Sequence, residues 1–294
     1  AQGFELVVNE PGQIAMLERA RLARPLAVWL KVDSGMGRLG FRAEQARAAW
    51  RRLADCPAVA VVRLMSHLAG ADAPGDPATA RQLARLRELR DLPGERSFAA
   101  SAGILAWPDS HADWVRPGLM LYGASPMVGR TGAEDGLLPV MTFRTRLIAL
   151  KDVARGEAVG YGGAWTAPEA TKIGIAAVGY ADGYPRHAPS GTPVLVSGAA
   201  RPLAGRVSMD MLAVDLGAAS TAAVGDPVTL WGPELPVETV AARAGTIPYE
   251  LLCRLARRVR VEVTGGEVVD GGGEPGAAGP APAQGRATKP VQPP

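Results

Sequence analysis

Tyrosine, aspartate and arginine side chains gather in one short stretch of the chain, AVGYADGYPR, residues 177–186. It follows an apolar run, IGIAAVG, that is typical of a buried strand, and its glycines at 179 and 183 allow a tight turn. A core strand has no use for so many polar groups at its end. Since a positioned phenol can act as a general acid or base, the stretch predicts a site at which Tyr180 works with other groups.

Four further stretches place a polar side chain where a predicted strand ends. LKVDSGMGRLG holds Arg38 in a glycine-rich turn, His67 follows an apolar run, Ser101 follows RSFAA, and Arg116 leads a Pro-Gly turn. A serine among small residues suits a phosphate, and a fixed cation at a strand end can face a cofactor. Each residue also has a plain structural interpretation: a solvated arginine, a core histidine, an ordinary turn and a structural arginine.

A dinucleotide site is a rival interpretation of the first of these stretches. Gly35, Gly37 and Gly40 match the pattern G-x-G-x-x-G between a strand and a helix. The next strand, however, ends in His67 and offers no acid to hold a ribose. Arg38 also stands inside the glycine loop, where a pyrophosphate needs bare backbone. The sequence therefore argues against a dinucleotide.

Predicted strands and helices alternate in the first part of the chain, up to about residue 125. The predicted strands are FELVV, AVWLKVD, AVAVVRLMSHL, RSFAASA and VRPGLMLYG. The predicted helices are IAMLERARLA, AEQARAAWRRLADC and PATARQLARLRELRDL. This alternation predicts a parallel sheet, open or closed into a barrel, with site residues at the carboxyl ends of its strands. The near-continuous apolar run AVWLKVD indicates a strand covered on both faces.

The pattern changes from about residue 138 to short β runs separated by Gly and Pro. These runs are TFRTRLIALKDV, TKIGIAAVGYA, TPVLVSG, RPLAGRVSMDMLAVDL and DPVTLWG, followed or accompanied by two short predicted helices, PVETVAARAG and PYELLCRLARRV. They predict an antiparallel all-β domain. With the boundary in the turn-rich SPMVGRTGAEDGLLP, we predict an α/β domain at 1–130, a β domain at 138–264 and a disordered tail at 265–294.

Composition limits the classes of function. A net charge of +3 over 294 residues, with no basic block, gives nucleic-acid binding no special support. No apolar run approaches the length of about 20 residues that a membrane span needs, and the first residues lack the pattern of a secretory signal. Cys56 and Cys253 lack metal-ligand spacing, so we expect no metal site and interpret both as buried thiols in a reducing compartment, the cytoplasm.

Taken in order, the motifs resemble those of the alanine racemases. The matching stretches are LKVDSGMGRLGF, SHLAGAD, FAASAGIL, VRPGLMLYGASP, VGYADGYPR and GRVSMDML, and the resemblance runs from near residue 5 to about 264. It implies an α/β plus β fold, in which a (β/α)8 TIM-type barrel, partial here, precedes an antiparallel all-β domain. It also implies an isomerase that interconverts L-alanine and D-alanine with pyridoxal phosphate and works as a head-to-tail homodimer.

The chemistry that the resemblance implies needs two acid–base groups. Pyridoxal phosphate forms an imine with the substrate and acts as an electron sink when the Cα proton leaves. In the family, a lysine and a tyrosine then serve opposite faces of the planar carbanion. Tyr180 matches that tyrosine, and His67 matches the residue that lies against it. A free phenol has a pKa near 10, so a cationic neighbourhood would favour its reactive form.

The resemblance also assigns the residues that contact the cofactor and the substrate. Those that contact the cofactor are Ser101, Arg116 and the backbone of Gly118 and Leu119. Arg38 matches a residue that touches both the cofactor and the substrate carboxylate, and Lys31 matches a lysine that is often carbamylated and steadies that arginine. Met209 matches a backbone contact to the substrate carboxylate, with Asp210 beside it. Tyr180 and Met209 would act in the partner's site.

One departure from the family concerns its cofactor lysine. The chain has four lysines: Lys31, Lys151, Lys172 and Lys289. None lies in a stretch like the family's cofactor-lysine segment. We therefore expect this chain to be an N-terminally truncated form that lacks the first barrel strands and does not racemise alanine by itself. A smaller departure is Arg257, near where many members have a tyrosine close to the phosphate.

Three alternatives belong to other classes. A non-catalytic remnant of the family would keep the fold without the reaction, although the retained site residues argue against it. A broad-specificity amino-acid racemase would share all of these motifs. An amino-acid decarboxylase of the same architecture would need a cysteine–aspartate pair in its second domain, and the sequence shows no such motif. Whether the enzyme makes D-alanine for the cell wall or degrades it stays open.

Overall fold

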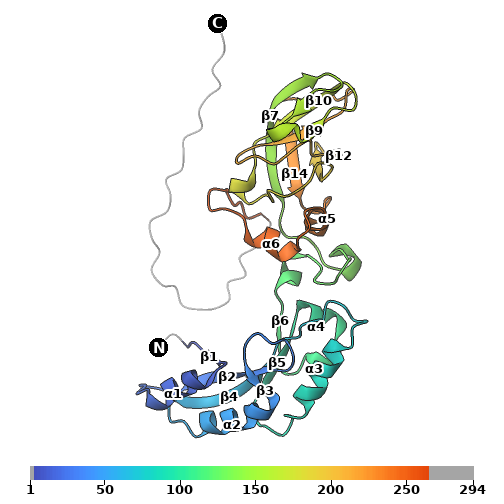
Figure 1. The fold of residues 1–294 in the computed structure, drawn as a ribbon. Coiled ribbons are helices and arrows are strands. Elements are labelled where there is room, and N and C mark those ends of the chain that lie inside the picture. The colour runs from blue at the N-terminus through green and yellow to red at the C-terminus, as the bar shows by residue number, and fades with distance from the viewer. Residues whose placement is uncertain (1–2, 265–294) are drawn as a thin grey trace. The chain divides into compact units, whose positions relative to one another are not determined.

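The computed structural model describes residues 3–264, which form two large sheets of different kinds and one small two-stranded sheet (Figure 1). All three sheets belong to one compact unit, Ala1–Arg258. A second unit begins at Val259, and its described residues, 259–264, contain no helix or strand. The predicted α/β part followed by an antiparallel β part is confirmed.

The first sheet is parallel along the order β1-β2-β4-β5-β6, with the short β3 paired to β2. Its strands are β1 (Leu6–Val8), β2 (Leu26–Asp33), β3 (Phe41–Arg42), β4 (Val59–Met65), β5 (Arg96–Ala100) and β6 (Trp114–Arg116). The helices of this part are α1 (Pro11–Arg19), α2 (Ala43–Ala54), α3 (Ala78–Arg87) and α4 (Ser101–Ala106). Because the strands are parallel, their carboxyl ends meet at one edge of the sheet.

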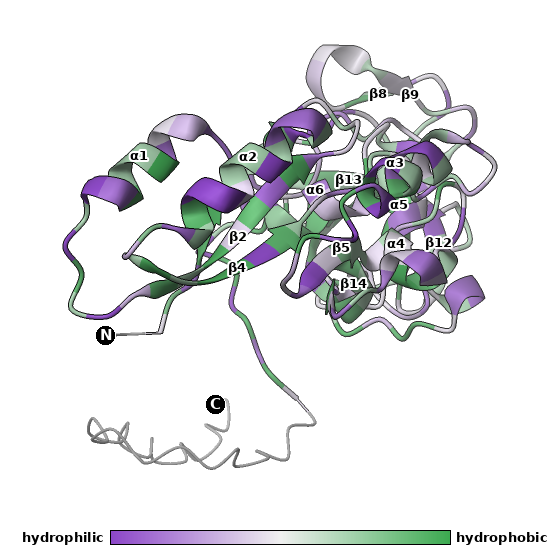
Figure 2. Cartoon of the chain, turned by 90° about the horizontal axis from the view of Figure 1, so that it is seen from below, coloured by the Kyte–Doolittle hydropathy of each residue, from purple (hydrophilic) through white to green (hydrophobic). Residues whose placement is uncertain are grey.

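One face of this sheet forms a hydrophobic core with the helices. Along β2, Val28, Leu30 and Val32 are buried and alternate with side chains that are only partly buried. Figure 2 shows both hydrophilic and hydrophobic residues on α1 and α2, as expected for helices with one face on a core and one in solvent. The prediction that AVWLKVD is covered on both faces is therefore wrong, since the opposite face carries Trp29 and Lys31, which are only partly buried.

The predicted strand VRPGLMLYG is only partly a strand. β6 ends at Arg116, and a 3-10 turn, η2 (Leu119–Tyr122), follows. Pro117 has no N–H to continue a ladder. The N–H groups of Gly118 and Met120 donate instead to the hydroxyl of Ser101, so the chain turns across the sheet edge at this point.

The second sheet is antiparallel, in the order β12-β11-β14-β7-β10-β13. Its strands are β7 (Phe143–Val153), β10 (Thr171–Ala176), β11 (Pro193–Val196), β12 (Ala199–Pro202), β13 (Leu212–Asp215) and β14 (Pro227–Trp231). A two-stranded sheet joins β8 (Ala158–Val159) and β9 (Trp165–Thr166), and two helices follow, α5 (Val237–Arg243) and α6 (Pro248–Cys253). An isolated antiparallel bridge between Leu203 and Val214 brings the two ends of the six-stranded sheet together, so the sheet nearly closes into a barrel.

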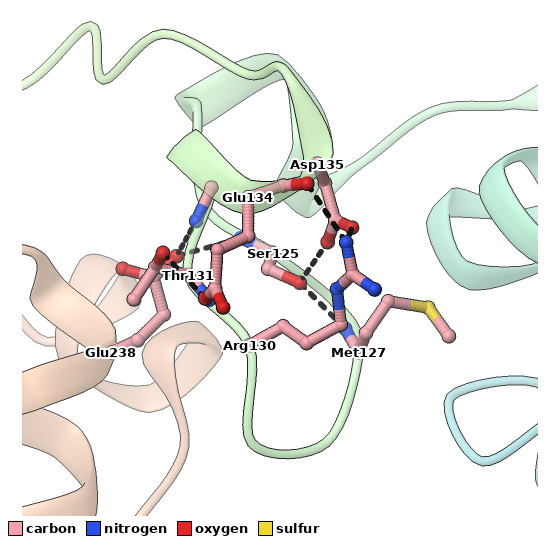
Figure 3. Close-up of polar contacts among 8 residues, drawn as sticks. Ser125, Met127, Arg130, Thr131, Glu134, Asp135 and Glu238 are labelled. Carbon is pink, nitrogen blue, oxygen red and sulfur yellow. Dashed lines mark hydrogen bonds and ion pairs between the residues drawn. The ribbon is translucent and has the colours of Figure 1, made fainter.

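The turn-rich segment between the two sheets is held by one carboxylate of α5 (Figure 3). The backbone N–H groups of Ser125 and Gly132 both donate to Oε1 of Glu238, at 2.8 and 2.7 Å. Within the segment, Asp135 accepts from the hydroxyl of Ser125 and pairs with Arg130 at 2.7 Å. The carboxylate thus fixes the path of a segment with little regular structure of its own, while the domain limits 1–130 and 138–264 stay predictions.

Two expectations about the C-terminal region are corrected by the structure. The helix predicted to reach Val259 ends at Cys253, because the chain beyond it bonds to another turn, with the N–H of Ala256 donating to the carbonyl of Asp182. Cys56 is buried as predicted, but Cys253, the last residue of the short helix α6, is exposed. Among the described residues, no helix has the length and apolarity to cross a membrane. The predicted tail, 265–294, lies outside the described residues.

Candidate active site

Four of the predicted site residues lie at the carboxyl edge of the parallel sheet. Lys31 lies near the end of β2, His67 follows β4, Ser101 follows β5, and Arg116 ends β6. These strands are neighbours, and their register pairs Lys31 with Met65 in β4. The parallel topology therefore gathers side chains that are up to 85 positions apart in the sequence, from 31 to 116.

Arg116 is held in a fixed orientation by two buried serines. Its Nη1 donates to Oγ of Ser97 at 2.5 Å, and its Nη2 donates to the carbonyl oxygen of Ser66 at 2.8 Å. Burial lowers the pKa of the Arg116 guanidinium below its ordinary value. A guanidinium still keeps its charge at neutral pH, so Arg116 provides a fixed cation at the sheet edge.

A buried polar layer lies behind this edge, and its main member, Gln82 of α3, was not predicted from the sequence. Its Nε2 donates to the carbonyl oxygen of His67 and to Oγ of Ser34, both at 3.1 Å, and its Oε1 accepts from the N–H of Ala69 at 2.8 Å. Gln82 is only 2% exposed. Because buried polar groups are costly when unpaired, this set of bonds specifies where the loop carrying His67 lies.

The site is electropositive around His67 and Lys31. Burial, followed by the charges of Arg116 and Arg38, lowers the pKa of His67 below its usual 6.5. The same two arginines, after burial, lower the pKa of Lys31 below its usual 10.5. The surroundings therefore favour the neutral forms of both side chains. Arg38 is exposed, but it lies close enough to His67 and Lys31 for its charge to lower the pKa of both.

The glycine turn that carries Arg38 is built around Asp33. Oδ1 of Asp33 accepts from the N–H groups of Gly35, Met36 and Gly37, at 2.9, 2.9 and 3.0 Å. Burial acts to raise the pKa of Asp33, but the three hydrogen bonds and the charge of Arg42 together outweigh it, so the pKa is lowered. Gly37 has φ of 70°, a conformation that favours glycine. Since the loop amides already bind the protein's own carboxylate, they are not free to bind a pyrophosphate, which agrees with the prediction that no dinucleotide binds here.

The donors around Ser101 fit the phosphate of pyridoxal phosphate, the cofactor that the resemblance implies. The buried Ser101 hydroxyl accepts from the N–H of Gly118 at 2.9 Å and of Met120 at 3.3 Å, with Leu119 between them. A Cβ added at Gly118 would lie 3.8 Å from this hydroxyl, so glycine leaves the space in front of it open. The Ser101 hydroxyl accepts both of these N–H groups and keeps its own O–H to donate. With the backbone amide of Leu119 and the nearby cation Arg116, it forms a donor set suited to a phosphate ester and a ring nitrogen.

The two tyrosines of AVGYADGYPR have different environments. Tyr184 is 1% exposed and stacks on Trp231 with ring centroids 6.3 Å apart, and burial raises its pKa further above 10. Tyr180 begins the short turn η5 (Tyr180–Asp182) after β10 and is 39% exposed. The guanidinium carbon of Arg186 lies 5.9 Å from the centre of its ring. Only Tyr180 is therefore accessible to a substrate.

The structure also brings Tyr180 together with the GRVSMDML stretch. The N–H of Tyr180 donates to the carbonyl of Ser208 at 3.0 Å, and the N–H of Ala181 donates to the carbonyl of Met209 at 3.0 Å. Met209 is 54% exposed, and Asp210 follows it. Within the described residues of this single chain, no hydrogen bond or ring contact joins Tyr180 to His67, so the predicted site residues form two groups.

Tyr249, in the first turn of α6, is a second residue that was not predicted from the sequence. Burial and the negative charge of Asp72, in the SHLAGAD stretch, raise its pKa above 10. An aromatic hydroxyl of the PYELLC helix therefore lies within electrostatic range of a motif from the parallel sheet. Arg257, which drew attention in the sequence instead, is exposed. The sequence did offer a signal for Tyr249, because a tyrosine stands at the second position of the predicted helix PYELLCRLARRV.

Comparisons with known proteins agree on one family. The family model described as "Alanine racemase, N-terminal domain" matches residues 1–126, and the one described as "Alanine racemase, C-terminal domain" matches residues 140–263. The alanine racemase of Shewanella sediminis (strain HAW-EB3) is 54% identical over 260 residues, which are 88% of this chain and 73% of that protein. The alanine racemase of Halorhodospira halophila (strain DSM 244 / SL1) is 52% identical over 271 residues, 92% of this chain and 74% of that protein.

Solved structures give the same result. The biosynthetic alanine racemase from Pseudomonas aeruginosa matches with a TM-score of 0.87 and 49% identity, over 89% of this chain and 73% of that chain. The alanine racemase from Acinetobacter baumannii matches with a TM-score of 0.81 and 40% identity, over 87% of this chain and 72% of that chain.

Proposed function

The chain belongs to the alanine racemase family, and from this premise we propose that it is an isomerase that interconverts L-alanine and D-alanine with pyridoxal phosphate. The observation that carries the proposal is the set of donors at the carboxyl edge of the parallel sheet. Ser101, the amides of the turn after β6 and the cation Arg116 converge there. Active sites of barrel enzymes lie at this end of the strands.

The residues proposed to hold the cofactor supply hydrogen-bond donors and one fixed charge. When bound, pyridoxal phosphate withdraws electrons from the substrate and so makes its Cα proton acidic. The Ser101 hydroxyl and the backbone of Gly118 and Leu119 would bind the phosphate, and Arg116 would donate to the ring nitrogen. Because an arginine does not give up its proton at neutral pH, Arg116 would orient the ring without protonating it.

Tyr180 is the proposed acid–base group on one face of the substrate. Its oxygen takes the Cα proton from L-alanine and returns a proton to the same face in the reverse direction. Arg186 places a cation over its ring, and His67 is proposed to lie against it in the assembled site. The backbone of Met209, with Asp210 beside it, is proposed to bind the substrate carboxylate.

Arg38 is proposed to bind the substrate carboxylate from the other side, and Lys31 to steady it as a carbamate. A lysine whose pKa is lowered has a larger fraction of neutral amine, which is the form that adds to carbon dioxide. The addition of the neutral amine to carbon dioxide forms an N–C bond, releases one proton and changes the charge of the side chain from neutral to negative. Starting from the ammonium, one further proton is lost before the addition. A negative carbamate near Arg38 and Arg116 would be paired, whereas the ammonium is repelled by both.

We propose that the active form is a head-to-tail homodimer in which Tyr180 and Met209 serve the partner's site. Tyr180, Met209 and Met211 are 39%, 54% and 45% exposed. Large apolar side chains gathered on one surface are typical of interaction sites. We also propose a cytoplasmic location, because Cys56 and Cys253 are both free thiols, as is usual in a reducing compartment.

The function is tested on the complete gene product, purified with pyridoxal phosphate. We expect it to convert either enantiomer of alanine to an equal mixture, and to exchange the Cα proton with deuterium from solvent. Serine and valine, offered separately, test for a broad-specificity racemase. Bound cofactor without any exchange at Cα of alanine would contradict the proposal.

A further inference from the structure

Three segments far apart in the sequence meet around Tyr180: its own turn, the GRVSMDML stretch and the segment after α6. The GRVSMDML stretch accepts two backbone hydrogen bonds from this turn, and the segment after α6 donates one, from Ala256 N–H to the carbonyl of Asp182 at 3.1 Å. The contacts are backbone to backbone. A Cβ at Gly179 would lie 2.3 Å from the carbonyl oxygen of Ser208, and one at Gly183 would lie 2.5 Å from that of Arg254.

The side chain of Arg258 bridges two of these segments. Its Nε donates to Oδ1 of Asp182 at 2.7 Å, and its Nη2 donates to Oδ1 of Asp210 at 2.6 Å. The second oxygen of Asp182 accepts the N–H of Gly179 at 2.9 Å. One guanidinium therefore joins the last residue of the Tyr180 turn to the residue that follows Met209.

We propose that Arg258 is a positioning residue that fixes Tyr180 relative to Met209 and Asp210. The proposal rests on the proposed function in so far as Tyr180 transfers the proton. The guanidinium is planar and presents its donors in a rigid fork, so two carboxylates bound to it cannot move independently. Without it, the carboxylates of Asp182 and Asp210 would repel each other, and the hydrogen bonds left between the two segments among residues 3–264 would be backbone ones.

The effect expected from Arg258 is on rate and not on folding. The side chain of Arg258 is 49% exposed, and those of its partners Asp210 and Asp182 are 54% and 17% exposed. Exposed ion pairs contribute little to stability, and the less exposed Asp182 keeps its hydrogen bond from the N–H of Gly179 when Arg258 is replaced. Proton transfer, by contrast, depends steeply on geometry, because small displacements of a reacting group slow the reaction strongly. Loss of Arg258 should therefore lower kcat while the protein stays folded.

The experiment compares Arg258→Ala and Arg258→Lys with Arg254→Ala in the complete, cofactor-loaded protein. Arg254 is the matched control, because it lies in the same segment, is similarly exposed, and its side chain pairs, among the residues that the structure describes, only with Glu250, four residues earlier, at 2.8 Å. Measured quantities are kcat and KM in both directions, the thermal midpoint, and amide hydrogen exchange in peptides covering 179–183 and 208–211.

We expect Arg258→Ala to lower kcat by about 10- to 100-fold, with little change in KM or in the thermal midpoint. Exchange should become faster in both peptides. Arg258→Lys keeps the charge but loses the fork, so its kcat should lie between those of Arg258→Ala and the wild type. Arg254→Ala should resemble the wild type in every measurement.

Wild-type kcat in Arg258→Ala, or an equal loss in Arg254→Ala, would overturn the proposal. If the wild type binds cofactor but does not racemise alanine, the proposed function fails, and the hydrogen exchange still decides on Arg258. Faster exchange confined to Arg258→Ala and Arg258→Lys then supports the positioning role, and unchanged exchange refutes it.

Discussion

The side-chain amide of Gln82 donates a hydrogen bond to the backbone carbonyl oxygen of His67 at 3.1 Å. The same side chain accepts the N–H of Ala69 at 2.8 Å, so Gln82 holds the loop on both sides of Leu68. A helix that is otherwise part of the hydrophobic packing thus supports the loop that carries a proposed active-site residue. This arrangement leads to the first prediction.

Replacing Gln82 by Leu should destabilise the protein by about 1–3 kcal/mol, because the partly buried bonds from Gln82 to the N–H of Ala69 and the carbonyl of His67 are lost. Denaturant unfolding measures the change. Gln45→Leu is the matched control, since Gln45 is exposed and accepts only the N–H of Arg42 at the start of α2. An equal effect of both substitutions would contradict the role given to Gln82.

His67 should make stability depend on pH in a defined direction. Its pKa in the folded protein lies below its usual 6.5, because of burial and the nearby cations. Well above pH 6.5, His67 is neutral in both the folded and the unfolded state, and the protein has the full stability that the neutral side chain allows. As the pH falls below 6.5, the unfolded state gains a proton that the folded state does not, so stability is lost until the lowered pKa is reached.

The measurement is the free energy of unfolding between about pH 5 and 8, for the wild type and for His67→Gln. We expect the wild type to lose more stability than the variant toward the acid end. His111 and His187 are present in both proteins, so their contributions cancel in the difference. Parallel pH curves would mean that the folded protein does not shift the titration of His67.

The sequence predicts the strand-end residues well for a physical reason. An apolar run followed by a polar residue marks the end of a strand, and parallel strands bring their carboxyl ends to one edge. The sequence pattern alone therefore places Ser101 and Arg116 at this edge, although it does not give the distance between them. The same logic failed for the rest of VRPGLMLYG, because its apolar residues form a 3-10 turn whose N–H groups bond to Ser101.

Residues that act through partners distant in sequence could not be found in this way. Gln82 bonds to His67 across 15 positions, and Arg258 bonds to Asp182 across 76. The amphipathic pattern of α3 predicts which face is buried but not that a glutamine on it reaches a loop. For Arg258, the predicted helix ran past the point where the chain actually leaves α6 to meet the Tyr180 turn.

Tyr180→Phe, in the complete protein, should lower racemisation by about 10²- to 10⁴-fold while cofactor binding is retained. The substitution keeps the ring beside Arg186 and removes only the oxygen that moves the proton. Exchange of the Cα proton with solvent deuterium should be followed from each enantiomer separately. It should fall most from L-alanine, the enantiomer whose proton Tyr180 is proposed to take.

Tyr184→Phe is the matched control for this prediction. The Tyr184 hydroxyl is buried and has no hydrogen-bond partner among the described residues, so its removal should leave both activity and stability nearly unchanged. If Tyr180→Phe exchanges L-alanine at the wild-type rate, or if both variants lose activity equally, Tyr180 does not have the proposed role.

The last prediction tests the dimer through two inactive variants, Arg38→Ala and Tyr180→Phe. Arg38 lies in a turn at the edge of the parallel sheet, and Tyr180 follows a strand of the antiparallel sheet. If each site combines Arg38 of one chain with Tyr180 of the other, a mixed dimer has one site with both lesions and one site with neither. Random reassociation of equal amounts makes about half of the dimers mixed, so roughly a quarter of the wild-type activity per site should return.

A second mixture, Arg38→Ala with Ser101→Ala, is the control. It shows whether activity also returns when two variants form mixed dimers that contain no intact site. Both residues belong to the same sheet edge, so in the mixed dimer each site carries one lesion and no activity should return. Subunit exchange is verified with differently tagged chains in both mixtures. If exchange occurs and the first mixture stays inactive, Arg38 and Tyr180 serve the site of their own chain. Return of activity in the second mixture would mean that Arg38 and Ser101 do not share a site.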